Sequence, residues 1–301
     1  MQRLEVPEPN QIANISMSDG ATIVLRRYGV SDGPRLVLSH GNGLAIDAYL
    51  PFWQLLCDRY DLIVFDVRNH GRNPHHTFEA HNWDRIGQDM DEIQDQISAR
   101  FGGKPMIGVF HSLSAVAAVR QVLAGGTRWS RLILFDPPFY PPAGHPLLAV
   151  QQEHLDRMAR LARRRPEHYE NIEDFSSLLS SRPQFSRWRP GAHDLFARAT
   201  LRQNPSSSRW DLACPRDYEA QIFETNRDGT VWPALAGGLD VPSKIIGADP
   251  LLSDRDGPSQ VCSALAQELG IDYESVPATT HMLQLEAPET CVAALERGLH
   301  L

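Results

Sequence analysis

The chain has 301 residues, of which 42% are hydrophobic and 22% charged, and its formal net charge is −8. A net negative charge repels nucleic acid and anionic membranes, so neither is an expected partner. No apolar run approaches the length of a bilayer span, and the first residues, MQRLEVPEPNQ, lack the apolar segment of a signal peptide. The four cysteines are scattered without metal-ligand spacing. We therefore expect free thiols and a cytoplasmic protein, either a monomer or a homodimer.

The first half of the chain alternates between strand and helix patterns. Residues 11–29 contain two β-rich runs around Asp19-Gly20, a pair that favours a hairpin turn. Helical patterns follow over 47–58 and 83–101. They separate continuous apolar runs at 34–41, 61–66, 105–112 and 131–136. Strands that are apolar throughout are typical of a parallel sheet covered on both faces, so we predict a doubly wound α/β sheet.

The alternation stops after a proline-rich junction that follows Asp136. Residues 139–238 read as helical, basic and rich in tryptophan, without a clear buried strand. Strand patterns resume at 241–249 and 271–277, a helix lies between them at 260–269, and Pro288 opens a final helix. We therefore predict a core domain made of 1–138 plus 239–301 and a helical cap, or lid, over 139–238. The arginine cluster at 157–165 is interpreted as a solvated helix face.

Polar residues that could carry chemistry follow several of the predicted strands. An acyl-transfer site needs a nucleophile, a base, a group that orients the base, and N–H donors for the oxyanion. In open α/β sheets such groups lie at the carboxyl ends of the strands. The candidates at these ends are His40-Gly41-Asn42-Gly43, Asp66, His111-Ser112, Asp136, Asp249 and the loop that holds His281. Serine, then aspartate, then histidine is a known chain order for a catalytic triad.

Five segments in the same order resemble the motifs of the α/β-hydrolase superfamily, in its capped serine-hydrolase branch. They are LSHGNG for the oxyanion loop, FDVRNHGRN for the family's D-x-R-G-H-G-x-S segment, FHSLSA for the nucleophile elbow, GADPLL for the acid segment, and THMLQLEAPE for the histidine loop. The resemblance covers nearly the whole chain except the insertion. It implies an α/β-hydrolase fold with a helical cap, a small-molecule substrate, and no cofactor or metal.

The resemblance also implies roles for individual residues. Ser112 would be the nucleophile, His281 the base, and Asp249 the residue that orients the base. The backbone N–H groups of Asn42 and Leu113 would form the oxyanion hole.

Substrate contacts are expected from both the core and the cap. Gly41 and Gly43 would let the loop backbone approach the substrate. An apolar pocket over the nucleophile would include Phe139, Trp188, Trp210 and Met282, although the cap aromatics are equally suited to forming the cap's own core.

Alternatives remain for two of these roles. Asp136 is the second candidate for orienting the histidine, and Asp254 and Asp256 are weaker ones because they lie further from a strand end. Ser112 by itself would suit a helix N-cap.

The elbow departs from the family pattern, because Phe110 and Ser114 stand where glycines are usual. Ser114 is small enough, but Phe110 needs extra room beside the helix. A shifted register with Ser114 as the nucleophile is disfavoured, because it would place the branched Val116 where a small residue is needed.

The other histidines suggest structural roles. His75, His76 and His81 are interpreted as surface residues of a polar loop rather than metal ligands. His111 is expected to pack or form hydrogen bonds, and His70 to tie its loop to neighbouring segments.

These observations predict a serine hydrolase that cleaves a small or medium, mostly uncharged ester or related acyl compound through an acyl-enzyme. One alternative is a hydrolase of the C–C bond in β-diketone-like ring-fission products, which uses the same triad. Another is a ligand-binding receptor on the same fold, an alternative that Phe110 keeps open.

Overall fold

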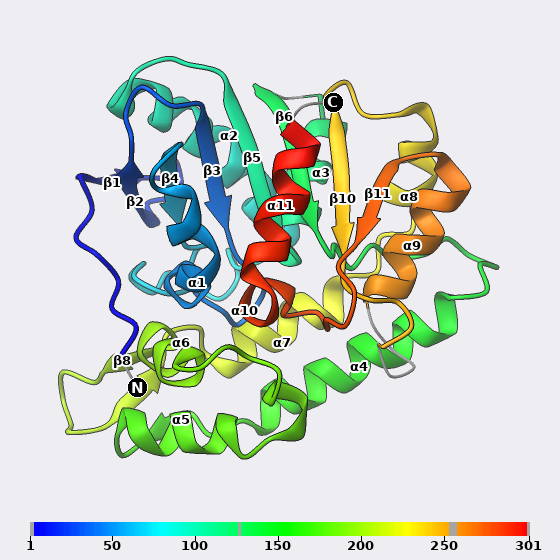
Figure 1. Ribbon diagram of the computed structural model, residues 1–301. Helices are drawn as coiled ribbons and strands as arrows, with labels where there is room; N and C mark the ends of the chain where they lie inside the picture. Colours follow the sequence, from blue (N-terminus) through cyan, green and yellow to red (C-terminus); the bar gives the residue numbers. More distant parts are fainter. Residues whose placement is uncertain (1–2, 126–127, 253–257, 300–301) are drawn as a thin grey trace.

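A computed structural model of the protein describes residues 3–125, 128–252 and 258–299. Eight strands form the main sheet: β1 Gln11–Ser16, β2 Thr22–Gly29, β3 Arg35–Ser39, β4 Asp61–Phe65, β5 Met106–His111, β6 Trp129–Phe135, β10 Ser243–Gly247 and β11 Asp272–Ser275. Their order is β1-β2-β4-β3-β5-β6-β10-β11 (Figure 1). The pairs from β4 to β11 are parallel, whereas β1, β2 and β4 pair antiparallel. The predicted α/β fold with a mostly parallel sheet is therefore confirmed.

The amino-terminal hairpin forms where the sequence predicts it. β1 and β2 pair in a register that sets Ser16 opposite Thr22, with the Asp19-Gly20 turn between them. The hairpin adds an antiparallel edge to the sheet through the pairing of β2 with β4.

Helices cover both faces of the sheet and enclose two hydrophobic clusters. One face is covered by α2 (Trp83–Phe101), α3 (Leu113–Leu123) and α9 (Pro258–Leu269). The other face is covered by α1 (Leu50–Trp53), α10 (Leu283–Glu286) and α11 (Pro288–Leu299) (Figure 1). The helix predicted at 47–58 is in fact α1 flanked by two short 3-10 turns, with Pro51 in its first turn.

Most of the insertion between β6 and β10 lies across the end of the sheet at which the strand arrows point, and its last helix lies beside the sheet near α9 (Figure 1). Its helices are α4 Leu148–Arg164, α5 Ile172–Ser180, α6 Ala192–Thr200, α7 Arg216–Thr225 and α8 Val231–Ala234. It also contains a small antiparallel sheet of β7 His168–Tyr169, β8 Leu201–Gln203 and β9 Trp210–Leu212. These strands span two or three residues and are partly exposed, so they leave no buried apolar run in the sequence.

The arginine cluster at 157–165 is a largely exposed helix face, as interpreted from the sequence, and two of its members also form ion pairs with a neighbouring helix. Arg163 of α4 forms ion pairs with Asp217 and Glu224 of α7, and Arg165 pairs with the buried Glu219 of the same helix. The cluster therefore joins two cap helices. None of the helices in the described ranges combines the length and hydrophobicity that a bilayer span requires.

Candidate active site

Ser112 occupies a tight turn between β5 and α3. Its backbone has φ 54° and ψ −113°, a conformation that residues other than glycine rarely adopt and that is found mainly at functional sites. The Ser112 N–H donates to the Phe135 carbonyl of the neighbouring strand β6, at 3.0 Å. Ser114 closes the turn, because its hydroxyl donates to the His111 carbonyl and accepts from the His111 N–H. The serine is thus held at the carboxyl end of the central strands with 7% of its surface exposed.

Room for the Phe110 ring comes from a glycine on the same strand. A Cβ built on Gly108 would lie 2.4 Å from Phe110 Cε2 and 2.8 Å from Leu132 Cδ2, which is too close for any side chain. The ring is fully buried and packs edge-on against Phe65 and Trp129. The missing elbow glycine is therefore compensated two residues earlier, and β5 keeps its parallel pairing with both neighbours.

His281 contacts the serine on one side and an aspartate on the other. Its Nε2 lies 3.0 Å from Ser112 Oγ, and its Nδ1 lies 2.7 Å from Asp136 Oδ2. Asp136 is fully buried, and its Oδ1 accepts the N–H of Ala248 at 3.1 Å. This arrangement has the connectivity of a Ser–His–Asp triad, in which the carboxylate fixes the imidazole tautomer.

The carboxylate that contacts His281 is Asp136 and not Asp249, so the structure contradicts the placement expected for Asp249. Asp249 lies two residues beyond the end of β10, and its carboxylate accepts the backbone N–H groups of Ala278 and Leu251. These bonds lower the pKa of its exposed carboxyl group. Asp136 directly follows β6, the strand next to the nucleophile strand, so its side chain reaches His281 without an intervening loop. The weaker candidates Asp254 and Asp256 lie outside the described residues.

The glycine-rich loop after β3 lies against the serine. A Cβ built on Gly41 would be 3.0 Å from Ser112 Cβ. Leu113 is the first residue of α3, where backbone N–H groups have no partner within the helix. The Asn42 side chain is turned away to donate to the Glu219 carbonyl at 2.8 Å, and the Gly43 N–H donates to His70 Nε2 at 3.0 Å. The Gly43 N–H is therefore already engaged.

A chain of hydrogen bonds joins this loop to the histidine loop. The Gly41 N–H donates to Tyr49 Oη at 3.4 Å, and Tyr49 Oη lies 2.7 Å from His111 Nδ1. His111 Nε2 lies 2.9 Å from the His281 carbonyl. Burial lowers the pKa of His111 well below its ordinary value, so the ring is neutral. A neutral ring that donates through Nε2 accepts at Nδ1, which fixes Tyr49 as the donor to that nitrogen.

Two of the aromatic residues predicted to line a pocket are instead buried in hydrophobic clusters. Phe139 is 1% exposed and lies in the cluster under α3. Trp188 is 5% exposed and packs against Phe185, His193 and Phe196, within the cap's own core.

The other two predicted pocket residues are only partly buried. Trp210 is half-buried in the small cap sheet. Met282 is half-buried and directly follows His281 at the start of α10.

The histidines of the polar loop divide into two groups. His75 is exposed and His76 half-buried, but His81 is fully buried, which corrects its interpretation as a surface residue. His70 ties its loop to Gly43, as expected. Tyr218 of cap helix α7 packs against the His81 ring in a tilted arrangement. This contact with the cap could not be anticipated from the loop sequence.

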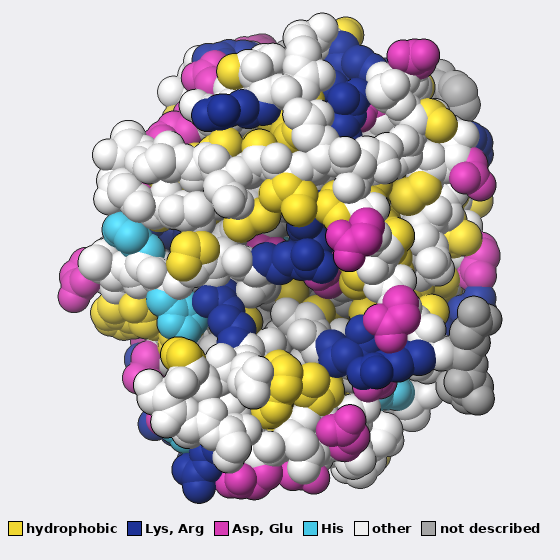
Figure 2. Space-filling model, turned by 90° about the vertical axis from the view of Figure 1, so that its left-hand side faces the viewer, with side chains coloured by type: hydrophobic (Ala, Val, Ile, Leu, Met, Phe, Trp, Pro, Cys, Tyr) yellow, Lys and Arg dark blue, Asp and Glu magenta, His cyan; other side chains and the backbone are white. Residues whose placement is uncertain are grey.

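A surface cavity of about 610 Å³ lies between the amino-terminal segment, the loop after β4 and the cap. Its lining consists of Glu5, Val6, Asp47, Gly71, Arg72, Pro74, Leu195, Arg198, Ala199, Leu201 and Arg202. Figure 2 shows the side of the molecule on which the amino-terminal segment lies. Lys and Arg side chains gather near the middle of this face (Figure 2). Because the lining includes neither Ser112 nor His281, the cavity is not the space in which a substrate would meet the triad.

Comparisons with known proteins identify chains of similar fold. Three solved structures resemble the chain over nearly its whole length, each at a low sequence identity that carries information on the fold alone. E-2-(acetamidomethylene)succinate hydrolase has a TM-score of 0.77 at 18% identity, covering 97% of this chain and 100% of that one. The thioesterase domain from the curacin biosynthetic pathway has a TM-score of 0.72 at 15% identity, covering 95% and 99%. A thermophilic esterase from Thermogutta terrifontis has a TM-score of 0.65 at 18% identity, covering 96% and 98%.

A search of curated protein sequences found no match. The sequence model of the alpha/beta hydrolase family, by contrast, matches residues 36–294, which include the sheet from β3 onward, the cap and all three residues of the triad-like arrangement. The chain belongs to the alpha/beta hydrolase family.

Proposed function

We propose that the protein is a serine hydrolase that cleaves a small or medium, mostly uncharged ester or related acyl compound through an acyl-enzyme on Ser112. The observation that carries the proposal is the position of His281, which lies within hydrogen-bond distance of both Ser112 Oγ and Asp136 Oδ2. Nucleophile, base and orienting carboxylate are the groups that acyl transfer requires.

In the proposed reaction, Ser112 Oγ attacks the substrate carbonyl carbon while His281 Nε2 takes the hydroxyl proton. The tetrahedral oxyanion accepts hydrogen bonds from the backbone N–H groups of Leu113 and Asn42. Collapse of this intermediate breaks the bond to the leaving group, which receives the proton from His281. Water then attacks the acyl-enzyme with His281 again as base, and the acid product and free serine are released.

The proposed preference for uncharged substrates rests on the residues near the serine. Leu44 packs close to Gly41, and the half-buried Met282 follows the catalytic histidine. Glu219 of the cap lies against Gly43 of the glycine-rich loop, but it is buried and ion-paired with Arg165, so neither charge is free to bind a substrate group of the opposite sign. Apolar walls with few polar groups are typical of small-molecule sites.

The test is turnover of short-chain aryl esters by the wild type, Ser112→Ala and a matched control, Ser130→Ala. Ser130 lies at the other end of β6, where its hydroxyl donates to the Met106 carbonyl. We expect Ser112→Ala to lose at least about 10³-fold in kcat and Ser130→Ala to keep its activity. Undiminished turnover in Ser112→Ala would refute the proposal. A β-diketone substrate in the same panel tests cleavage of C–C bonds.

A further inference from the structure

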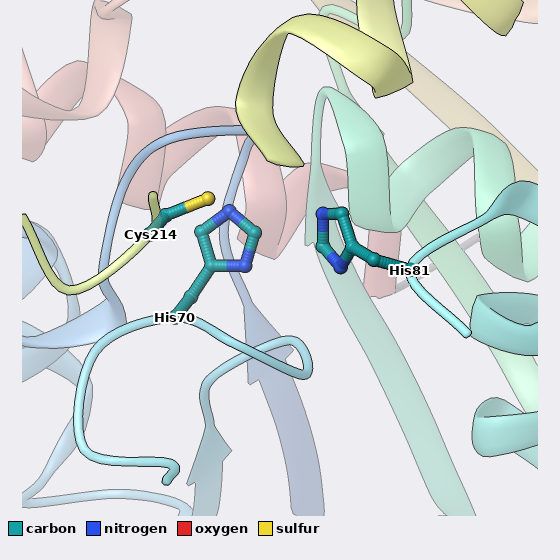
Figure 3. Close-up of side chains that lie close together, drawn as sticks. All are labelled: His70, His81 and Cys214. Carbon is teal, nitrogen blue, oxygen red and sulfur yellow. The ribbon is translucent and has the colours of Figure 1, made fainter. Parts of the chain in front are cut away.

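Three buried side chains with metal-binding atoms converge beneath the glycine-rich loop. His70 lies in the loop after β4, His81 lies just before α2, and Cys214 lies in the cap just before α7 (Figure 3). Their ligand atoms all lie within 4.8 Å of one another, and all three residues are at most 5% exposed. The proposed hydrolytic reaction uses none of these three side chains.

His70 already has the tautomer of a metal ligand. Its Nδ1 donates to the Arg68 carbonyl at 2.8 Å, so the lone pair is on Nε2, the nitrogen nearest Cys214 in Figure 3. A backbone acceptor on the other ring nitrogen is the usual support for a metal-bound histidine. In the metal-free state this lone pair accepts the N–H of Gly43.

His81 contributes an atom whose hydrogen-bonding capacity is unused. Its Nε2 is buried and has no hydrogen-bond partner among the described residues. Asn69 orients the ring: its Oδ1 accepts the His76 N–H, so its Nδ2 faces His81 Nδ1 at 3.2 Å and the ring proton lies on Nε2. A buried polar atom without a partner costs about 1–3 kcal/mol, so it requires an explanation.

We propose that His70, His81 and Cys214 bind a divalent cation of the zinc class and that this cation links the cap to the core. Two imidazoles and a thiolate are ligands that Zn²⁺ prefers. Tetrahedral zinc with bonds of about 2.0–2.3 Å sets its ligand atoms roughly 3.3–3.6 Å apart. The ligand atoms of the three residues now lie within 4.8 Å of one another. If they move about 1 Å closer together, they occupy three of the four coordination positions of the cation.

Binding requires defined proton movements. The Cys214 thiol loses its proton to solvent, and the His81 proton moves from Nε2 to Nδ1. The Asn69 amide turns its oxygen toward that proton, and the bond that this oxygen accepts from the His76 N–H is broken. Burial raises the pKa of the Cys214 thiol well above its ordinary value, so the cation must supply the stabilisation of the thiolate. One proton is released to solvent for each cation bound, and affinity should increase with pH.

Binding should also disturb the glycine-rich loop. His70 Nε2 cannot accept the Gly43 N–H and ligate a cation at the same time. Occupancy therefore breaks the hydrogen bond between Gly43 and His70, and Gly43 lies next to Asn42 in the loop that meets Ser112. This consequence rests on the proposed function: zinc should lower ester turnover, whereas binding itself should be unaffected by Ser112→Ala.

The direct test is titration of the metal-free protein with Co²⁺, followed by its thiolate-to-cobalt charge-transfer band, and with Zn²⁺ in competition. We expect the protein to bind one cation per chain. The charge-transfer band should be lost in Cys214→Ser, and the affinity for Co²⁺ should fall at least about tenfold in His81→Gln. The controls are Cys57→Ser, which removes the most exposed of the four thiols, and His75→Gln, which removes an exposed histidine next to Ala213. Both should bind as the wild type does.

A variant that binds Co²⁺ more tightly distinguishes a real metal site from an effect of misfolding, because misfolding can only weaken binding. In Asn69→Asp, one carboxylate oxygen can accept from the His76 N–H and the other from His81 Nδ1–H, which is the partner that a ligating histidine needs. We expect Co²⁺ affinity to increase by about 10-fold or more. Circular dichroism of each metal-free variant checks folding. Absence of the band in folded wild-type protein, or its persistence in Cys214→Ser, would overturn the proposal.

Discussion

Exchange of Asp136 for Asn should nearly abolish turnover. The Ala248 N–H holds Asp136 Oδ1 at 3.1 Å, so the Asn oxygen should stay there and the amide nitrogen should face His281 Nδ1. A donor in that position forces the histidine proton onto Nε2, opposite Ser112 Oγ, where it blocks removal of the serine proton. The equivalent change in serine proteases costs about 10⁴-fold, so we expect a loss of about 10³- to 10⁴-fold, or about 4–5.5 kcal/mol in activation free energy.

The matched control is Asp249→Asn. Among the described residues, this carboxylate accepts only backbone N–H groups of its own loop and of Ala278, so turnover should change by about twofold or less. The assay is steady-state hydrolysis of an aryl ester, with burst kinetics to separate acylation from deacylation. If Asp249→Asn were the inactive variant and Asp136→Asn kept its activity, the assignment of the orienting carboxylate would be refuted.

Three further changes test the packing and protonation of the site. Gly108→Ala should lower the free energy of unfolding by about 1–3 kcal/mol, because the new methyl group meets the buried Phe110 ring. Urea denaturation measures this loss, and adding Phe110→Leu, which removes the ring, should recover part of it. His81 is neutral when folded, because burial lowers its pKa to about 3, so stability is lost as pH falls from about 6.5 toward 3. In metal-free buffer His81→Gln should remove about 2 kcal/mol of the loss measured between pH 7.5 and pH 5, and an unchanged pH dependence would contradict this. Tyr49→Phe leaves His111 Nδ1 without its donor and should cost about 1–3 kcal/mol in urea denaturation, whereas a neutral effect would argue against the hydrogen-bond chain.

Much of the fold could be predicted because its signals are local. The hairpin follows from Asp19-Gly20, and the helix at 83–101 has the same bounds in the structure. The cap strands could not be predicted, because two or three partly exposed residues, as at His168–Tyr169, leave no apolar pattern.

The site was harder to predict where it depends on neighbouring strands. The resemblance favours Asp249, but the side chain that reaches His281 belongs to Asp136, whose position follows from the pairing of β5 with β6. That pairing is a tertiary property. The one signal in the sequence that favours Asp136 is its position directly after a predicted strand.

Of two further features, the first is local and the second depends on contacts between distant segments. The space for Phe110 requires knowledge that Gly108 points to the same face of β5, which strand periodicity does supply. The burial of His81 requires the cap, because Tyr218 and Cys214 come from more than a hundred residues further along the chain.

The most direct test of the proposed mechanism is covalent labelling by a fluorophosphonate, read by intact mass and peptide mapping. We expect one adduct per chain on Ser112, formed at least about 10³-fold more slowly in His281→Ala and Asp136→Asn and at the wild-type rate in Asp249→Asn. Absence of labelling in the folded wild type, or an adduct on another residue, would contradict an active Ser112–His281–Asp136 triad.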